Sequence, residues 1–569
     1  MANRLKHLLS RIILEFQSAF IPGRLITDNV LISFEILHYL RRKKQGKNGC
    51  MTLKLDMSKA YDRMEWSFLQ AILLQMGFVE AWVDMIMECL RTISYNIDHG
   101  GESLGPIIPS RGIRQGDPLS PYLFIICAKV DDRFLYCKAN REEAQRVLEL
   151  LNTFEQASGQ KVNLNKSSVF FSSNTDVGTR DSILSTLHMR AADDHSLYLG
   201  LPSRVGRNKN VTFGFLKEKV RKRIHKWDSK LFSRAGKEVL LKSVIQSLPT
   251  YAMSVFLIPL EICKDVDRLM GRYWWHTKSS QGQGIHWRSW NKLCLHKHQR
   301  GLGFQNLGDF NLAMLGKQGW RLLTNNSSLV VRVFKARYYP HSSFLDAELG
   351  ANPSYVWRSV LGAKYVVKMG ARWRVGAGFS ISILNQPWLP YKEYPYMLPL
   401  LMWLSMTRDI DLIHCIPLSL SSVEDARFWV LETHGDYSVK SAYHALQVTN
   451  GRWSTQDNSG FWRIFWNLKL PPKRLAMLLW GVWGARNDLV WNNKALSVER
   501  VVNAAITYLD SWKNAQLENR VVSPISGPIT SGCEQWSKPY FGEIKLIVMP
   551  DLFLAEAMAL KEALCNTRD

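Results

Sequence analysis

The sequence predicts an α+β domain at the amino terminus, followed by a mainly helical region. Three observations support this: residues 1–175 alternate between helical and strand patterns, residues 211–242 carry a helical apolar stripe, and residues 520–533 have the composition of a linker. The chain has 569 residues, of which 46% are hydrophobic. At about 150 residues per domain, this length suffices for several domains with buried cores, so a wholly disordered chain is excluded.

Local patterns define the elements of the first region. Apolar side chains recur at helical spacing over residues 66–76, and Gly77 is expected to end this helix. Residues 93–97 alternate as in a strand and lead into a His-Gly-Gly sequence, which predicts a hairpin. A second helical stripe spans residues 144–154 and is expected to end near Gly159.

The composition predicts the kind of partner. The chain carries 73 Lys and Arg against 49 Asp and Glu, a formal net charge of +24, which favours nucleic acid before a membrane surface. The nine cysteines form no CxxC pair, which argues against a disulfide scaffold and a finger-type zinc site. The longest uncharged run, residues 243–260, contains two prolines and suits a buried core better than a membrane span. We therefore expect a soluble, intracellular protein.

Residues 211–242 combine an apolar helix face, including Leu216 and Ile224, with a basic one. Residues 217–242 hold ten Lys and Arg against three acids. Such an excess favours binding to phosphates, and a solvated helix face is the alternative. Residues 270–375, rich in Trp and Arg, are expected to extend this surface, although a single Trp more often fills a core.

Asp56 is the strongest single candidate for chemistry. In the segment LKLDMSKAYDR, Leu53 and Leu55 point to one face of a strand, and Lys54 and Asp56 point to the other. A carboxylate at the end of a strand is a suitable ligand for Mg²⁺, which accepts one or two carboxylates together with phosphate oxygens. The alternative is an N-cap at a strand-to-helix turn.

Two further segments carry candidate residues. Residues 110–124 combine glycines and prolines in a rigid turn, where Gln115 and Gly116 let an amide and the backbone approach a flat ligand. Taken alone, this would be an ordinary loop. Asp131 and Asp132 precede a strand-like run, and adjacent buried carboxylates repel unless a cation lies between them. The alternative for this pair is a solvated turn.

In this order, the three segments resemble the reverse transcriptase region of LINE-type, non-LTR retrotransposons, especially those of plants. QSAFIPGRLITDN (17–29) and ASGQKVNLNKS (157–167) are similar to further blocks of that polymerase. The resemblance continues downstream in YLGLP (198–202), GLGFQNL (301–307), PSYVWRS (353–359), RWRVGAG (372–378), FWRIFWNLKLPPK (461–473) and LAEAMALKEAL (554–564).

The resemblance implies a right-hand polymerase of fingers, palm and thumb, here truncated, followed by a mainly helical region and a ribonuclease H-like remnant. Four parts follow from it. They are incomplete fingers and palm (1–175), a thumb-like and connection region (176–400), a remnant of the zinc-binding domain (401–495) and the ribonuclease H-like remnant (520–569).

The resemblance also implies RNA-directed DNA synthesis, in which two Mg²⁺ ions assist the attack of the primer 3′-hydroxyl on the α-phosphate. Asp56 and Asp131 would be the bridging ligands, with Asp132 beside them. Tyr61 matches the position that stacks under the incoming sugar and excludes a 2′-hydroxyl. The remaining implied roles are lining of the nucleotide pocket by Gln115 and Gly116, protonation of pyrophosphate by Lys166 and contact with the triphosphate by Arg24.

The implied partners are an RNA template, a DNA primer and deoxynucleoside triphosphates, with no membrane, and the family suggests action in the nucleus. The basic helix would be thumb-like and would grip the template–primer duplex through its phosphates. The residues expected to do so are Lys217, Lys219, Arg221, Lys222, Arg223 and Lys226.

Segments typical of the family are missing. Only 13 residues separate Asp117 from Asp131, where the family has a helix, a variable stretch and the first strand of the catalytic hairpin. Without that strand, the ladder that holds Asp131 against Asp56 is expected to lose its partner. We therefore expect little or no polymerase activity, and the alternative function is a non-catalytic, basic nucleic-acid-binding remnant.

The downstream parts are also incomplete. Residues 461–495 contain no Cys or His, so no zinc is expected. The ribonuclease H-like part keeps Glu556 but lacks the strand that carries the first catalytic Asp, so ribonuclease H activity is expected to be absent.

Overall fold

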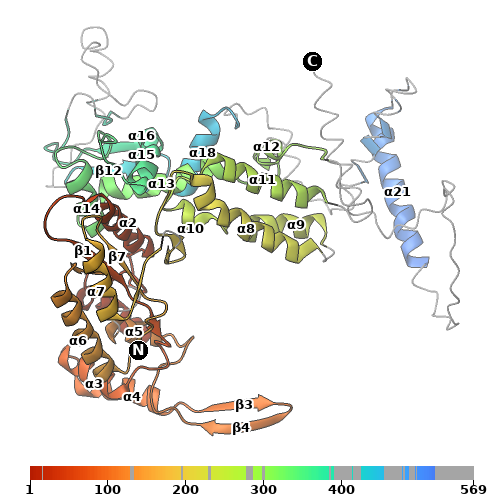
Figure 1. The fold of residues 1–569 in the computed structure, drawn as a ribbon. Helices are drawn as coiled ribbons and strands as arrows, with labels where there is room; N and C mark the ends of the chain where they lie inside the picture. The colour runs from red at the N-terminus through yellow and green to blue at the C-terminus, as the bar shows by residue number, and fades with distance from the viewer. Residues whose placement is uncertain are drawn as a thin grey trace, which may run out of the picture. The chain divides into compact units, whose positions relative to one another are not determined.

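A computed structural model describes most of the chain, in two compact units that are interleaved in sequence (Figure 1). The described residues are 1–15, 17–127, 134–193, 196–228, 232–276, 286–297, 301–382, 386–389, 424–453 and 496–518, with a few isolated positions between 413 and 494. Unit 1 comprises Met1–Phe215, Pro249–Ile262 and Gly308–Leu446, and unit 2 comprises Leu216–Leu248, Cys263–Leu307 and Gln447–Asp569. The four-part division stays a prediction, and its ribonuclease H-like part, 520–569, lies outside the described residues.

Unit 1 contains a four-stranded sheet in the order β5–β1–β7–β8. β1 pairs antiparallel with both of its neighbours, so Lys54 faces Phe134 on one side and Ser168 on the other. β7 and β8 run parallel. The strands span Cys50–Lys54 (β1), Phe134–Lys138 (β5), Ser168–Phe171 (β7) and Arg190–Ala191 (β8). β1 confirms the strand predicted before Asp56, and β5 confirms the strand predicted after Asp132.

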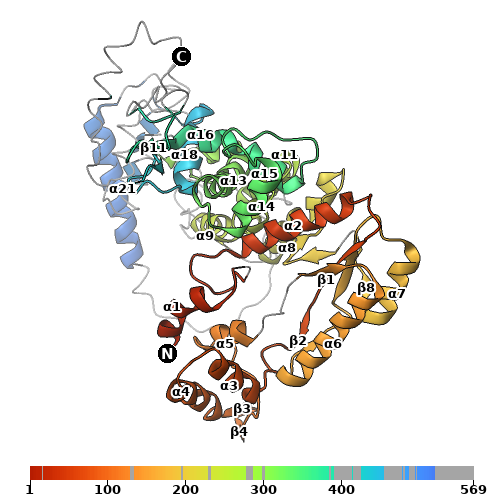
Figure 2. The ribbon, with the colours of Figure 1, turned by 90° about the vertical axis from the view of Figure 1, so that its left-hand side faces the viewer.

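Helices cover both faces of this sheet because its apolar side chains alternate between the faces (Figure 2). Met51 and Leu53 of β1 pack with α6 and α7 in one core. On the opposite face, Phe170 of β7 packs with Leu37 and Leu40 of α2. These helices span Ile26–Arg42 (α2), Arg141–Ser158 (α6) and Val177–Leu187 (α7).

A second core of unit 1 is formed mainly by helices, and two of the predicted helix ends are confirmed. The core-forming helices are α1 (Ala2–Ile12), α3 (Trp66–Gln75), α4 (Glu80–Arg91) and α5 (Ser120–Cys127). Gly77, just after α3, has a φ of 84°, the left-handed conformation that favours glycine. Gly159 ends α6 in the same way, with a φ of 73°.

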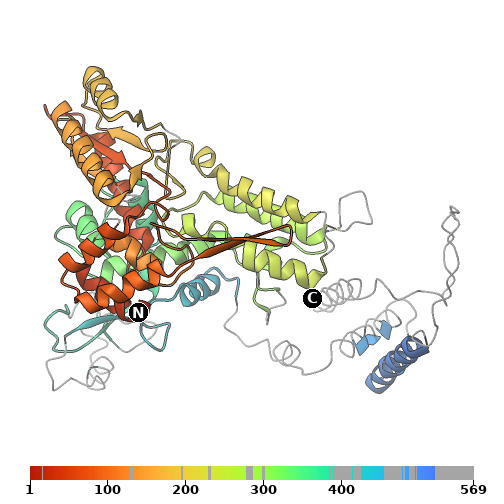
Figure 3. The ribbon, with the colours of Figure 1, turned by 90° about the horizontal axis from the view of Figure 1, so that it is seen from below.

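The predicted hairpin is also confirmed. It consists of β3 (Tyr95–His99) and β4 (Glu102–Ile107), and Figure 3 shows it as a two-stranded ribbon. All eleven residues of the two strands are exposed.

The residues of Gly308–Leu446 belong to unit 1 because their helices pack onto α2. Both α14 and α15 contact α2. Arg321 of α13 donates to both carboxylate oxygens of Asp28, at 2.7 and 2.8 Å, and so joins residues 293 positions apart. The described elements are α13 (Leu307–Thr324), α14 (Leu329–Tyr338), α15 (Tyr355–Gly362), α16 (Lys364–Gly370), β11 (Ala371–Arg374), β12 (Ala426–Trp429) and α18 (Val439–Thr449), together with α10 (Thr250–Met253) earlier in the chain.

The described part of unit 2 is helical. The predicted apolar face is confirmed on α8, where Leu216, Val220 and Ile224 are buried. The prediction of one helical stretch up to Lys242 is wrong. α8 ends at Asp228, and α9 begins behind Ser233, whose hydroxyl accepts a hydrogen bond from the N–H of Gly236 at 3.2 Å. The elements are α8 (Lys209–Asp228) and α11 (Leu260–Trp275), which both begin in unit 1, α9 (Arg234–Leu240), a π-helical turn (Leu241–Ile245), α12 (Trp290–Leu293) and α21 (Val498–Glu518).

The Trp side chains of residues 270–375 mostly fill cores. Trp274, Trp275, Trp320 and Trp357 are each at most 8% exposed, whereas Trp287 is 52% exposed. The expectation of a Trp-rich binding surface is therefore wrong for these four residues, because a large aromatic ring stabilises a core most when it is fully buried. Among the described helices, none is long and apolar enough to cross a membrane.

Candidate active site

The structure places Asp56 at the end of β1, as predicted. Its N–H donates to Ser167 Oγ at 3.1 Å, and its carbonyl accepts from the N–H of Asn163 at 2.7 Å. The half-buried carboxylate of Asp56 has no hydrogen-bond or ion-pair partner among the described residues. The backbone is therefore held from both sides while the carboxylate stays available to a ligand.

The alternative of an N-cap at Asp56 is wrong. The next two residues form a short strand, β2 (Met57–Ser58), which pairs antiparallel with β6 (Lys161–Val162), and the next helix begins at Trp66. Asp56 therefore lies between two strand pairings and caps no helix.

The ladder that leads to Asp56 keeps its partner over the described residues, contrary to expectation, whereas the placement of Asp131 against Asp56 stays a prediction. Five consecutive residues of β1 pair with β5, the strand that follows Asp131 and Asp132 in sequence. The missing strand of the family hairpin would precede these aspartates, so its loss leaves this pairing intact. Asp131 and Asp132 themselves lie outside the described residues.

The segment after Asp56 and the glycine-rich turn lie against each other. The carbonyl of Tyr61 accepts from the N–H of Ile113 at 2.9 Å, and Trp66 Nε1 donates to the carbonyl of Gly112 at 2.7 Å. The ring of Tyr61 stacks on Phe124 of α5, with 4.7 Å between ring centroids. These contacts fix the turn that carries the exposed Gln115 and Gly116, of which Gly116 has a φ of 95°.

Lys166 and Arg24 have different surroundings. Lys166 is exposed in the turn next to Ser167, which holds the backbone of Asp56. The guanidinium of Arg24 donates to the carbonyls of Leu14 and Gln17, at 2.5 and 2.7 Å. It also donates to the carbonyls of Ser10 and Ile13, so it satisfies groups at and beyond the end of α1. Its contact with a triphosphate stays a prediction.

Sequence reasoning assigned no role to three residues that support Asp56 and its neighbours. Asn163 and Ser167 hold the backbone of Asp56, and the buried Gln160 donates from Nε2 to the carbonyl of Ala60 at 2.7 Å. All three lie in the block 157–167. The resemblance of residues 157–167 to the polymerase family is the sequence feature that could have pointed to these three residues, because polar residues in a family motif often hold another segment in place.

Among the described residues of the basic stretch 217–242, the exposed basic side chains lie on α8. Arg221, Lys222, Arg223 and Lys226 are exposed, as the sequence predicts for a phosphate-binding face. Lys217 instead contacts Asp265 Oδ2 at 2.8 Å, and this hydrogen bond holds the pKa of Asp265 below its usual range. Lys219 is exposed as well.

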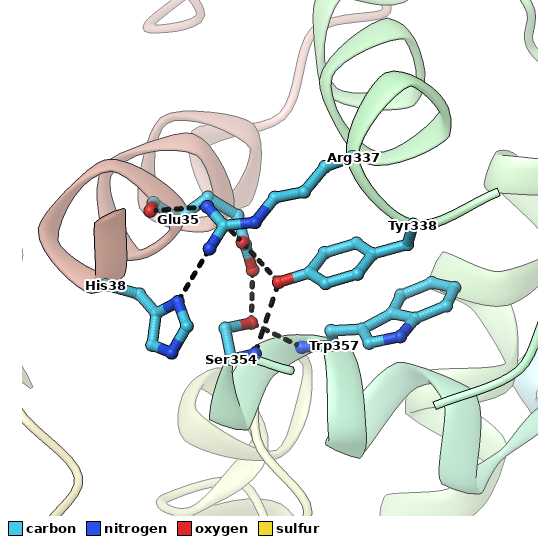
Figure 4. Close-up of polar contacts among 6 residues, drawn as sticks. All are labelled: Glu35, His38, Arg337, Tyr338, Ser354 and Trp357. Atoms are coloured by element: carbon cyan, nitrogen blue, oxygen red, sulfur yellow. Dashed lines mark hydrogen bonds and ion pairs between the residues drawn. The ribbon is translucent and has the colours of Figure 1, made fainter. Parts of the chain in front are cut away.

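A buried polar network joins α2 to α14 and to Ser354, the residue before α15 (Figure 4). Glu35, 1% exposed, accepts hydrogen bonds from the hydroxyls of Tyr338 and Ser354 and lies 3.3 Å from Arg337 Nη1. Arg337 Nη2 and His38 Nδ1 are 2.7 Å apart. Burial raises the pKa of Glu35 more than its hydrogen bonds and the charge of Arg337 lower it.

We expect His38 to make folding sensitive to mild acid. Burial, reinforced by the charge of Arg337, lowers the pKa of His38 to about 4. The unfolded chain therefore takes up this proton near pH 6.5, whereas the folded chain does not until about pH 4, so stability falls as the pH falls through this window. The free energy of unfolding should drop by about 1–2 kcal/mol between pH 7.5 and 5 on account of His38. Urea midpoints of the wild type and His38→Gln should converge at pH 5; an equal separation at both pH values would contradict this.

Comparisons with known proteins agree with the geometry. Residues 1–203 match the family described as reverse transcriptase (RNA-dependent DNA polymerase). An uncharacterised mitochondrial protein of Arabidopsis thaliana is 35% identical over 144 residues, which cover 25% of this chain and 93% of that protein. Residues 1–203 therefore belong to the reverse transcriptase family.

Two longer relatives are similar to parts of this chain, and one of them is named for a mobile element. A putative ribonuclease H protein of Arabidopsis thaliana is 28% identical over 298 residues, 47% of each chain. A retrovirus-related Pol polyprotein from a type-2 retrotransposable element of Drosophila melanogaster is 31% identical over 119 residues, 21% of this chain and 11% of that protein. The chain thus spans about half of the first and a tenth of the second, and the predicted retrotransposon origin is confirmed.

Proposed function

We propose that this reverse transcriptase chain is an RNA-directed DNA polymerase that extends a DNA primer on an RNA template with deoxynucleoside triphosphates, in the nucleus. The pairing of β1 with β5 supports this most strongly, because it sets the strand that leads to Asp56 beside the strand that follows Asp131 and Asp132. Primer extension by the full chain and by Asp56→Asn tests the proposal.

The proposed site is completed by Asp131 and Asp132. Lys54 faces Phe134 in the ladder, and Asp56 lies two residues beyond Lys54. Asp132 and Asp131 precede Phe134 by two and three residues, and a residue advances an extended chain by about 3.3 Å. In our proposal, these carboxylates therefore meet at the same end of the β1–β5 pair.

The residues present fit Mg²⁺, since carboxylate oxygens are its usual protein ligands and Asp56 offers a carboxylate with no partner among the described residues. Two bound ions would activate the primer hydroxyl and stabilise the leaving pyrophosphate. Asp56, Asp131 and Asp132 would hold them, and Ser167 would keep Asp56 in place.

The remaining residues would position the nucleotide. Tyr61, held by its stacking on Phe124, would form the floor under the sugar. Gln115 and Gly116 would line the base and sugar side of the pocket from the adjoining turn. Lys166, whose side chain has no partner among the described residues, would donate a proton to pyrophosphate.

A second candidate function is nucleic-acid binding without catalysis. The observation that favours it is the exposed basic face of α8, which does not depend on an assembled catalytic site. This function is retained if the chain binds template but does not extend a primer.

We expect the basic face of α8 to bind nucleic acid in a salt-dependent manner. If it neutralises about five phosphates, log K for a single strand should fall with log salt at a slope of about −3.5. Changing Arg221, Lys222 and Arg223 together to Ala should make this slope shallower by about 2, measured by fluorescence anisotropy from 50 to 300 mM salt. Changing Arg4, Lys6 and Arg11 of α1 removes the same charge and serves as the control. Equal slopes for wild type and the α8 variant would contradict the assignment.

A further inference from the structure

A short loop of unit 1 presents one aromatic ring almost completely to solvent. Phe379 is 94% exposed, and it follows β11 in the segment Val375-Gly-Ala-Gly-Phe-Ser. An exposed Phe normally costs stability, because the apolar surface of its ring stays in contact with water. In this loop the neighbours of the ring in sequence are small, so they do not cover it.

The loop is held in shape by a single carboxylate. Asp425 Oδ1 accepts from the N–H groups of Gly376 and Gly378 at 2.7 and 2.9 Å, and its Oδ2 accepts from the N–H of Ser380 at 2.8 Å. These N–H groups hold the pKa of Asp425 below its usual range, led by that of Ser380. The hydrogen bonds lie on both sides of Phe379, so the ring is presented by a fixed backbone.

The strands beside the loop carry arginines. Arg427 of β12 lies over the ring of Trp373 in β11, 3.8 Å from its centroid, and Arg374 lies 5.6 Å from the centroid of Phe428. Arg372 Nη1 donates to the carbonyl of Ala371 at 2.9 Å, and Nη1 of Arg427 is buried. Arg374, at the end of β11, is exposed, so its N–H groups can reach a phosphate.

The combination fits a strand of nucleic acid better than a protein. An exposed ring provides a face for an unpaired base, and the exposed Arg374, five residues before Phe379, suits the charged backbone of such a strand. A protein interface normally needs about 800 Å² of complementary surface on each partner, and a single ring between small residues offers far less. The formal charge of +24 further favours a polyanion.

We propose that Phe379 is a base-stacking site for single-stranded nucleic acid, with a phosphate bound by the exposed Arg374 at the end of β11. Like the proposed polymerase site, this site would bind nucleic acid, but it contains none of the residues of the polymerase site. Binding of nucleic acid at Phe379 therefore does not require polymerase activity. The site is separate from the basic face of α8, and it adds recognition of an unpaired base to the recognition of phosphate.

The test measures binding of the full chain to a fluorescent 12-nucleotide single-stranded RNA. Phe379→Ala should weaken binding about 5- to 150-fold, because stacking of one base on an aromatic ring contributes about 1–3 kcal/mol. Phe379→Trp keeps a stacking face and should bind as tightly as the wild type. Asp425→Ala should also weaken binding, because the loop loses the acceptor that fixes it. On a strand of abasic nucleotides, wild type and Phe379→Ala should bind equally.

Each other result would overturn the proposal. Unchanged binding of RNA by Phe379→Ala would show that the ring contacts no base. An equal loss on the abasic strand would show that the loop acts through phosphates, and loss of a protein partner with intact RNA binding would assign the ring to a protein interface. Binding is measured without primer, Mg²⁺ or deoxynucleotides, so a failure of the proposed polymerase function is distinguishable from a failure of this site.

Discussion

Asp56→Asn should lower the rate of Mg²⁺-dependent primer extension at least about 1000-fold. The substitution keeps the size of the side chain and the backbone contacts to Ser167 and Asn163, but it removes the negative charge that would hold both metal ions. Two-metal catalysis depends on closely spaced ions, and small misplacement of reacting groups costs orders of magnitude in rate. The measurement is extension of a labelled DNA primer on an RNA template by the full chain.

Asp62→Asn provides the matched control, because it makes the same chemical change six residues further on, at an exposed side chain. It should leave the rate within about twofold of the wild type, as a surface substitution does. Chains with the missing segment restored between Cys127 and Asp131 should extend primers faster, since the first hairpin strand would support the aspartates. If the unmodified chain binds template but gives no extension, the non-catalytic function is correct.

Glu35→Ala should destabilise unit 1 by about 3 kcal/mol. The carboxylate accepts hydrogen bonds from Tyr338 and Ser354 and pairs with Arg337, and all three would lose this acceptor in a buried site. Removing one partner of a buried ion pair is far more costly than the net contribution of the pair, because the remaining charge stays desolvated. The measurement is the midpoint and slope of urea unfolding at pH 7.5.

Glu35→Gln separates the loss of charge from the loss of all acceptors. Its amide oxygen still accepts one hydrogen bond, so the loss of stability should be smaller than for Glu35→Ala. Glu15→Ala is the surface control, because Glu15 pairs with Arg332 at 3.4 Å while its side chain is 68% exposed. It should cost at most about 0.5 kcal/mol. A cost for Glu35→Ala as small as that for Glu15→Ala would contradict the structural role of the network.

Local patterns were sufficient for the elements that frame the site. The helix over 66–76 ends at Gly77, the hairpin follows residues 93–97, and Asp56 lies at a strand end because short-range periodicity and glycine positions act within a few residues. The family motifs then identified the polymerase without any structure. These helix ends, turns and motifs could be predicted because each depends only on residues that are close together in the sequence.

Tertiary structure decided which distant segments meet. From the sequence we expected a missing strand to disrupt the ladder beside Asp56. The pairing of Lys54 with Phe134 shows that β1 instead pairs with β5, the strand that follows Asp131 and Asp132 in the chain. No local pattern in α2 indicates that Glu35 binds Tyr338, 303 residues away, or that Trp357 is buried rather than exposed to bases. Strand order, buried ion pairs and the burial of large rings depend on packing between segments far apart in the chain. These interactions stabilise the protein only when the distant segments come into contact. The sequence by itself therefore determined the helices, the strands and the candidate catalytic residues, whereas the tertiary structure determined which segments pair and pack with one another.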